Sequence, residues 1–222
     1  MRGLYAILDH PDPHAHDPAA HAGALLAGGA CCLQLRAKAL EPAERRAVAL
    51  AVAPIAQAHG VPFVINDDVE LALAGIRGVT GLHLGQEDVE ALAAHGRPLE
   101  ALVETLHRRD LIVGLSTHDL EQVAEVRGVG LGYIGFGPVF ATASKKNPDP
   151  IVGVEGVERA SQLSDVPVVA IGGIDLDGAR ACASAGASAV AVISGLRRPQ
   201  LRDIRRAATE FTRCFDGVPH RS

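Results

Sequence analysis

Short apolar runs alternate along this chain with longer stretches rich in Ala, Leu, Glu and Arg. The stretch Pro42–Ala58 is typical of the longer ones, because its Ala, Val and Leu residues share one helical face and a Glu-Arg-Arg cluster lies on the other. The apolar runs have the length of strands and predict eight of them. These are Gly3–Leu8, Cys32–Arg36, Pro62–Asn66, Gly81–Leu84, Leu111–Leu115, Tyr133–Phe136, Pro167–Ile171 and Ala189–Ile193.

Strands that alternate with helices favour a parallel sheet covered by helices. Eight such units within 222 residues predict an α/β fold, a single TIM (β/α)8 barrel that spans residues 1–222 as one domain. A doubly wound open sheet is the alternative, but no Gly-x-Gly-x-x-Gly motif follows the first strand. Asp175, Asp177 and Thr117 are expected to begin helices.

The composition fits this fold and narrows the range of partners. Apolar residues make up 48% of the chain and aromatic residues 3%, so Ala, Val, Leu and Ile must fill the core. A formal net charge of -5 argues against general nucleic-acid binding. The basic stretch from Arg197 to Arg213 is interrupted by Asp203 and Glu210, which is typical of a solvated helix face.

The four cysteines show no metal-binding spacing, because Cys31 and Cys32 are adjacent while Cys182 and Cys214 stand alone. Reduced, partly buried thiols in a cytoplasmic protein are the expectation. The apolar run near Met1 is too short for a signal peptide, and no stretch reaches the length of a membrane span.

Three successive predicted strand ends are rich in glycine and in hydrogen-bond donors. The first continues into Gly137–Lys146, which ends in hydroxyl and ammonium groups, and the others are Ala170–Ile174 and Ala191–Gly195. Glycine lets backbone N–H groups approach a ligand closely, and nearby cations balance its charge. The three ends together therefore predict a phosphate site, although each alone would fit an ordinary glycine turn that caps a helix.

The end of the second strand carries Gln34, Arg36 and Lys38. Alternation along a strand sends all three to the same side, which in a barrel is the mouth at the C-terminal ends of the strands. Two cations and an amide do not sit in a dry core without an anion. We therefore expect them to bind a phosphorylated small molecule, with a surface position as the alternative for Lys38.

The next two strand ends place Asp67 and Asp88 on neighbouring loops. Hard oxygen ligands beside a phosphate site are typical of Mg²⁺, whereas no soft ligands converge here to favour zinc. The alternative is that each carboxylate caps the helix that follows it. As a pair beside predicted phosphate donors, the two are expected to bind Mg²⁺.

Further polar residues follow the fourth and fifth strands. His83 is expected to orient a neighbour, and Ser116 is a candidate donor to a phosphate or a ring nitrogen. Thr117 is expected to cap a helix and His118 to lie beyond it near the surface. The Gly-x-Ser-x-Gly elbow is missing, which argues against a hydrolase triad.

Together these blocks resemble the thiamine phosphate synthase family across Leu4 to about Leu196. The matching blocks, in the family's order and spacing, are residues 34–38, 65–67, 81–88, 114–118, 137–142 with Lys145, and 170–174. The block Gly-Leu-His-Leu-Gly-Gln-Glu-Asp at residues 81–88 is specific. The Gly-Gly-Ile block is shared by many phosphate-binding barrels.

The resemblance implies that an aminopyrimidine methyl pyrophosphate loses pyrophosphate and that the nitrogen of a thiazole phosphate takes the methylene carbon. The products are thiamine phosphate and pyrophosphate. The resemblance implies a dissociative step, in which the pyrophosphate leaves first and the pyrimidine stabilises the carbocation that remains. Catalysis then needs charge stabilisation on the departing pyrophosphate more than a strong base.

The family pattern also implies roles for particular residues. The pyrophosphate or pyrimidine is contacted by Gln34, Arg36, Lys38, Asn66 and Lys145, and Mg²⁺ is bound by Asp67 and Asp88. The thiazole phosphate and pyrophosphate lie near Ser116, Thr142 and Ser144, and the backbone around Gly173, Ile193 and Ser194 forms the thiazole phosphate cradle. The residues expected to act in catalysis are Arg36, Lys38, Ser116 and Lys145.

The chain departs from the family pattern at three places. Asp68 stands where the family usually has Arg, which adds a negative charge beside a proposed metal ligand. Ser144 stands where a second Thr is usual, and Asp9 and His10 follow Leu8 where Thr-Asp is common. None of these changes removes a central group of the proposed site.

Two other functions stay open from the sequence. The thiazole tautomerases are a similar sister family, in which a histidine near Ser116 transfers a proton, and His118 is the candidate for that role. The retained cations of the second strand and the pair Asp67 and Asp88 favour the synthase instead. A non-catalytic thiamine-precursor binding protein would keep the phosphate donors without needing a metal pair. The oligomeric state also stays open, a homo-oligomer included.

Overall fold

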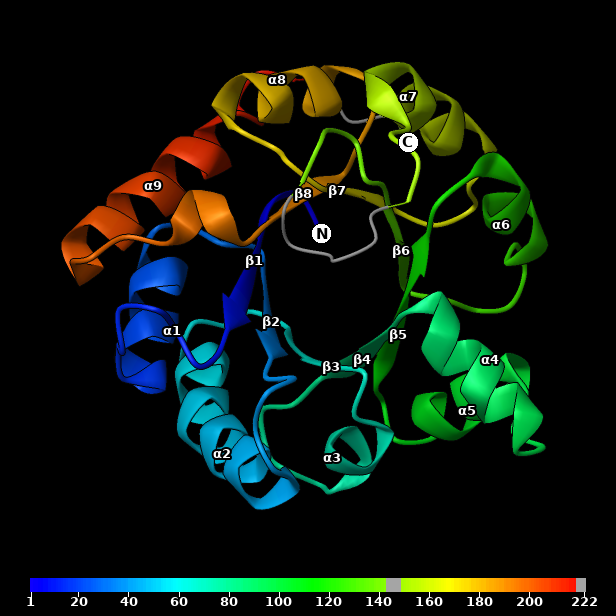
Figure 1. Cartoon of the computed structure of the whole chain (residues 1–222), viewed down its shortest axis with the longest axis horizontal. Coiled ribbons are helices and arrows are strands. Elements are labelled where there is room, and N and C mark those ends of the chain that lie inside the picture. The colour runs from blue at the N-terminus through cyan, green and yellow to red at the C-terminus, as the bar shows by residue number, and fades with distance from the viewer. Residues whose placement is uncertain (143–148, 219–222) are drawn as a thin grey trace.

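The computed structural model describes residues 1–142 and 149–218 and contains a closed barrel of eight parallel strands. Each strand pairs with the next in sequence, and β8 pairs with β1 (Figure 1). The TIM barrel is therefore confirmed, and the open sheet is wrong. The strands are β1 Gly3–Asp9, β2 Cys32–Arg36, β3 Phe63–Asn66, β4 Gly81–Leu84, β5 Ile112–Thr117, β6 Tyr133–Phe136, β7 Val168–Ile171 and β8 Ala189–Val192.

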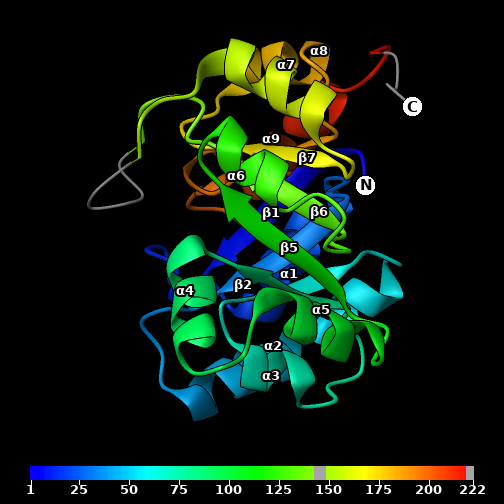
Figure 2. The same cartoon turned by 90° about the vertical axis from the view of Figure 1, so that its right-hand side faces the viewer.

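Helices surround the barrel and connect consecutive strands (Figures 1 and 2). They are α1 Pro18–Ala27, α2 Pro42–Ala58, α3 Val69–Leu73, α4 Gln86–Ala94, α5 Leu99–His107, α6 Leu120–Glu125, α7 Gly153–Leu163, α8 Leu176–Ser184 and α9 Leu201–Arg213, with a 3-10 helix, η1, at Ser194–Leu196. The bounds of α2 are those predicted. Within the described ranges, no helix is both long enough and apolar enough to cross a membrane.

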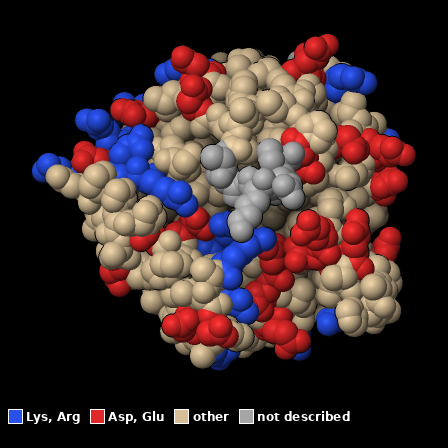
Figure 3. All heavy atoms as spheres, viewed as in Figure 1, with Lys and Arg blue, Asp and Glu red and all other residues tan. Residues whose placement is uncertain are grey.

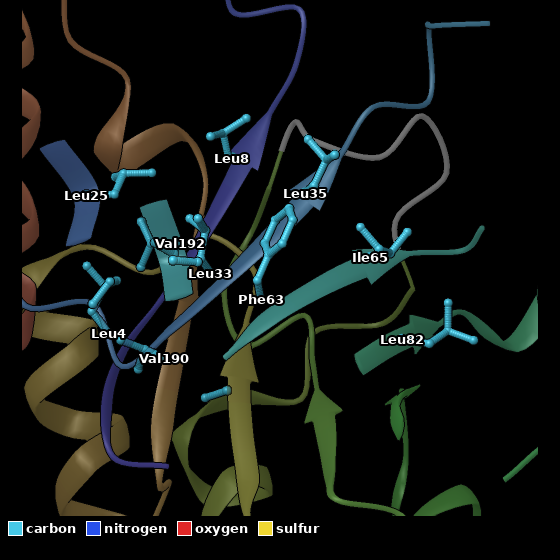
Figure 4. Close-up of a cluster of buried hydrophobic side chains, with 14 of the residues drawn as sticks. Leu4, Leu8, Leu25, Leu33, Leu35, Phe63, Ile65, Leu82, Val190 and Val192 are labelled. Atoms are coloured by element: carbon cyan, nitrogen blue, oxygen red, sulfur yellow. The ribbon is translucent and has the colours of Figure 1, made fainter. Parts of the chain in front are cut away.

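Alternation along the strands divides the core into two layers. Outward-facing strand residues pack against the helices. Figure 4 shows Leu4 and Leu8 from β1 and Leu33 and Leu35 from β2 in this layer, together with Leu25 of the covering helix α1. The inner layer fills the barrel itself and consists of Tyr5, Ile7, Cys32, Val64, Tyr133, Val169, Ala189 and Ala191. Because Ala189 and Ala191 are small, the two inward tyrosines occupy much of the barrel interior.

The helix starts show where local sequence signals succeed and fail. The side chain of Asp175 accepts from Gly178 N at 2.8 Å and caps α8 as predicted, whereas Asp177 lies inside the first turn. Thr117 was expected to cap a helix and does not, because β5 continues through it and its Oγ1 donates to Gly135 O at 3.1 Å. Asp119 caps α6 instead.

Candidate active site

A cavity of about 500 Å³ opens at the C-terminal ends of the strands. The predicted site residues that line it are Gln34, Arg36, Lys38, Asn66, Asp67, Asp88, Ser116, Thr142, Gly173, Ile193 and Ser194. Basic and acidic side chains lie side by side near the middle of this face (Figure 3). Ser144 and Lys145 lie outside the described residues.

One carboxylate on β1 holds two guanidinium groups at the rim of the cavity. Asp9 lies opposite Arg36 in the register of β1 and β2, and its Oδ1 pairs with Arg36 Nη1 at 2.6 Å. Its Oδ2 pairs at 2.6 Å with Nη2 of Arg197, which follows η1. Asp9 was missed as a site residue because the first strand was predicted to end at Leu8. The period-two alternation through Tyr5 and Ile7 was the signal that could have found it.

Asp67 occupies an unusual backbone conformation directly after β3. Its φ of 63° lies in the left-handed region, which is uncommon for a residue with a side chain. The chain turns sharply there, so that Asp67 lines the cavity and Asp68 begins α3. Asp67 Oδ2 pairs with Lys38 Nζ at 2.8 Å. The alternative in which Asp67 caps the following helix is therefore wrong.

Asp88, in the first turn of α4, is a direct neighbour of Asp67 in the cavity wall. Its Oδ2 accepts from Gly85 N at 3.0 Å, so it does help to cap its helix. Burial raises the pKa of the Asp88 carboxyl, and the neighbouring negative charge of Asp67 raises it further. Such a pair of carboxylates is stabilised by a cation held between them.

The donors present fit a hard divalent cation. Among residues 1–142 and 149–218, no group of three His, Cys, Asp or Glu side chains forms a metal cluster. A cation at Asp67 and Asp88 would therefore complete its shell with waters and substrate oxygens, which is the habit of Mg²⁺. Carboxylate oxygens from two loops supply the hard ligands that this ion prefers.

Asp68, which stands where the family usually has Arg, makes its contacts away from the pair Asp67 and Asp88. Its Oδ1 accepts from Leu71 N at 2.9 Å, and its Oδ2 pairs with Arg45 Nε at 2.9 Å. Asp68 lines an adjoining cavity of about 380 Å³, which Arg97 also lines and which shares Lys38, Asn66 and Asp67 with the main cavity. The extra negative charge is thus balanced by Arg45, and Asp68 does not line the main cavity.

The opposite side of the rim is built from closely packed backbone. A Cβ at Gly137 would lie 2.0 Å from Ile171 O, and one at Gly173 would lie 2.3 Å from Ala141 O. Gly173 also has a φ of 62°, which L side chains rarely adopt. These glycines let the loops after β6 and β7 pack together, which is a reason for glycine independent of any phosphate.

A connected set of polar side chains lies inside the barrel below the rim. Tyr5 Oη lies 2.7 Å from Tyr133 Oη, which lies 3.0 Å from His83 Nδ1. His83 Nε2 in turn lies 3.0 Å from Ser116 Oγ, so its contacts are those of an orienting residue. Burial lowers the pKa of His83 to about 4, and the imidazole is therefore neutral at pH 7. The tyrosines were missed, although these two residues are the only tyrosines in the sequence and both face inward.

His118 lies in the cavity wall rather than at the surface as predicted. β5 continues two residues beyond its predicted end, so that His118 directly follows the strand, and it lines the cavity. The Nδ1 of His118 lies 2.7 Å from Gly137 O and 3.5 Å from Asp149 Oδ2.

Comparison with known proteins agrees with this geometry. A family model described as thiamine monophosphate synthase matches residues 4–196. A thiamine-phosphate synthase of Chlorobium phaeovibrioides is 38% identical over 181 residues, which cover 82% of this chain and 81% of that protein. A thiamine-phosphate synthase of Albidiferax ferrireducens is 36% identical over 215 residues, covering 97% of this chain and 92% of that protein.

Solved structures extend the comparison to the fold. Thiamine phosphate pyrophosphorylase from Pyrococcus furiosus superposes with a TM-score of 0.80 at 30% identity, covering 97% of this chain and 96% of that one. The (S)-3-O-geranylgeranylglyceryl phosphate synthase of Thermoplasma acidophilum has a TM-score of 0.68 at 15% identity, with 98% and 94% covered, and shares the fold alone. The family model and the relatives agree with the resemblance seen in the sequence, and the chain belongs to the thiamine monophosphate synthase family.

Proposed function

We propose that this protein couples 4-amino-2-methyl-5-pyrimidinylmethyl pyrophosphate with a thiazole phosphate to form thiamine phosphate and pyrophosphate. The observation that carries the proposal is the meeting of two charge systems in one cavity. Arg36 and Lys38 supply positive charge for an anionic leaving group, while Asp67 and Asp88 supply ligands for a cation that would bind the same group. Family membership supports the same reaction.

The chemistry requires one bond to break and one to form. The bond between the methylene carbon and the pyrophosphate oxygen breaks, and its electron pair leaves with the pyrophosphate. The thiazole nitrogen then donates its lone pair to the methylene carbon. Arg36 and Lys38 stabilise the charge that develops on the leaving oxygen, and Ser116 and Gln34 hold the pyrimidine. In this scheme no side chain has to act as a strong base.

Mg²⁺ is part of the proposal. When bound at Asp67 and Asp88, it would supply Lewis-acid stabilisation of the pyrophosphate oxygens. Asp67 already pairs with Lys38, so this lysine is placed to contact the same phosphate oxygens. Thr142, Ser144, Lys145 and the backbone at Gly173, Ile193 and Ser194 are proposed to bind the phosphate groups on the opposite side.

A reducing compartment suits the four free cysteines. Burial raises the pKa of the Cys31 thiol to about 11, so that it stays protonated and unreactive at pH 7. We therefore propose that the enzyme works in the cytoplasm on soluble phosphorylated substrates.

The test is incubation of the purified protein with both phosphorylated precursors, with and without Mg²⁺, while thiamine phosphate is measured. Thiamine phosphate that forms only with Mg²⁺ supports the proposal. Conversion of a thiazole isomer without coupling would instead establish a tautomerase and direct attention to His118. Precursor binding without any turnover would establish a binding protein.

A further inference from the structure

Five side chains from five different strands form an unbroken series of hydrogen bonds inside the barrel. Gln34 Nε2 donates to Tyr5 Oη at 3.0 Å, and the series continues through Tyr133 and His83 to Ser116 over three further contacts of 2.7, 3.0 and 3.0 Å. Four of the five residues are buried, and all five line the cavity. We call this series the Tyr–His network.

The direction of each bond in the network follows from the one before it. Tyr5 Oη accepts from Gln34 and lies 2.7 Å from Tyr133 Oη, and we assign the single hydrogen of Tyr5 to this second bond, with Tyr133 as the acceptor. The buried hydrogen of Tyr133 needs an acceptor and finds it in Nδ1 of His83. In a neutral imidazole the other nitrogen then carries the hydrogen. Nε2 of His83 therefore donates to Ser116 Oγ.

The two ends of the network consequently offer opposite groups to a ligand. Ser116 accepts from His83, which makes the serine hydroxyl hydrogen available to the cavity. Gln34 uses its Nε2 on Tyr5 and keeps its side-chain carbonyl as an acceptor. One end thus presents a donor and the other an acceptor, and three intervening residues fix this arrangement.

We propose that the Tyr–His network sets substrate specificity, in that Tyr5, Tyr133 and His83 act as positioning residues that select an aminopyrimidine over its oxo analogue. The inference rests on the proposed function and names the feature of the substrate that the site reads. An aminopyrimidine offers ring nitrogens that accept and an amino group that donates, which complements Ser116 and Gln34.

The oxo analogue reverses both roles, because a carbonyl replaces the amino group and the adjacent ring nitrogen carries a hydrogen. If the network keeps its direction, the hydrogen of Ser116 and the carbonyl of Gln34 have no complementary groups on the oxo ring, and only the second lone pair of Ser116 and the second hydrogen of Gln34 Nε2 remain to pair with it. Unpaired buried groups are the basis on which polar sites reject close analogues. A connected network therefore discriminates more strongly than a lone serine and a lone glutamine, since turning either end breaks its hydrogen bond to the network.

The first test measures the tautomer of His83 by nitrogen NMR in the substrate-free protein. The expected result is a hydrogen on Nε2 and an acceptor nitrogen at Nδ1. A hydrogen on Nδ1 would mean that the network runs the other way, and it would overturn the inference. This measurement needs no catalysis, so it separates a failure of the inference from a failure of the proposed function.

The second test removes single hydroxyls within the network. Tyr133→Phe and Tyr5→Phe each keep the ring and leave Gln34 and Ser116 in place. In both variants the preference for the amino over the oxo pyrophosphate, measured as a ratio of kcat/KM and as a ratio of Kd, is expected to fall at least about tenfold, the worth of one neutral hydrogen bond. The matched control is Thr117→Val, which removes a buried β5 hydroxyl outside the network.

The outcomes of this test are distinct. Ratios that stay at the wild-type value in two folded variants would overturn the inference while leaving the coupling reaction in place. A wild-type protein that binds both pyrophosphates without turnover would contradict the proposed function alone, since the Kd ratio still decides the specificity. If Tyr133→Phe fails to fold, Tyr5→Phe carries the test from the other end of the network.

Discussion

The two halves of the cavity rim are built by different means. From β2 to β4 the rim consists of charged side chains held by ion pairs, such as Arg36 with Asp9 and Lys38 with Asp67. From β6 to β8 it consists of backbone packed so closely that a side chain at Gly137 or Gly173 would meet a carbonyl oxygen. Ion pairs can exchange partners when a ligand enters, whereas packed backbone cannot move without cost. The charged half is therefore expected to respond to metal, pH and salt, and the glycine half to side-chain volume.

Removing a carboxylate from the charged half is expected to have the largest effect. Asp88→Asn keeps the shape of the side chain but removes the charge that would hold a cation with Asp67. We expect kcat/KM for coupling to fall roughly a hundredfold to a thousandfold, the scale of a lost electrostatic stabiliser. Calorimetry should show weaker Mg²⁺ binding at unchanged helix content. Glu90→Gln on the same helix is the control, and an equal loss there would contradict the metal role.

Adding one methyl group to the glycine half is expected to affect stability most. In Gly173→Ala the new Cβ would meet Ala141 O at a φ of 62°, so strain and overpacking add. The free energy of unfolding should fall by about 4 kcal/mol in urea titrations, and the KM for thiazole phosphate should rise. Gly128→Ala is the control, since its φ is 76° with open space around the Cβ, and it should lose only about 1 kcal/mol. Equal losses would show that the close packing is unimportant.

The charged half also contains His83, whose imidazole is neutral at pH 7, and the pH dependence of stability should reveal its contribution. The folded-state pKa of His83 is about 4, below its usual 6.5, so the unfolded chain binds the proton more readily. The stability that His83 contributes is complete above pH 6.5 and is lost as the pH falls towards 4, by about 3 kcal/mol. Denaturant titrations from pH 7 to pH 4 should show this slope, and His83→Gln should flatten it. His59→Gln, at an exposed position, should keep the slope; a slope that survives in His83→Gln would assign it elsewhere.

The smallest effect is expected at the ion pairs that connect the two halves. Asp9 holds Arg36 on one side and Arg197, next to the β8 loop, on the other. Asp9→Asn should lower kcat about fivefold because Arg36 loses its orientation, while the gain of positive charge keeps KM from rising. Steady-state kinetics would check both values. Glu104→Gln, which breaks an exposed pair with Arg108, should change neither, and a rise in KM alone would count against a positioning role for Asp9.

Much of this protein could be predicted from local patterns. The three strands β2, β4 and β6 have the predicted bounds, and α2 begins and ends as expected. The other strands differ by one or two residues, β5 at both ends and the rest at one end. Hydrophobic periodicity carries this information because alternation and helical spacing are properties of neighbouring residues. The same alternation placed Gln34, Arg36 and Lys38 together at the mouth, where the structure has them.

Only the tertiary structure decided which polar residues meet. Tyr5 and Tyr133 are far apart in the sequence and bond through the barrel interior, and Asp9 gathers Arg36 from the next strand and Arg197 from beyond β8. Closure of the barrel creates these contacts, and no local period encodes them. The choice between Asp67 and Asp68 has the same origin, because one left-handed residue after β3 sends the first carboxylate into the cavity and the second to Arg45. The sequence thus determined the elements and the end of the barrel at which the polar side chains gather, while barrel closure and a single backbone turn decided the partners of each charge.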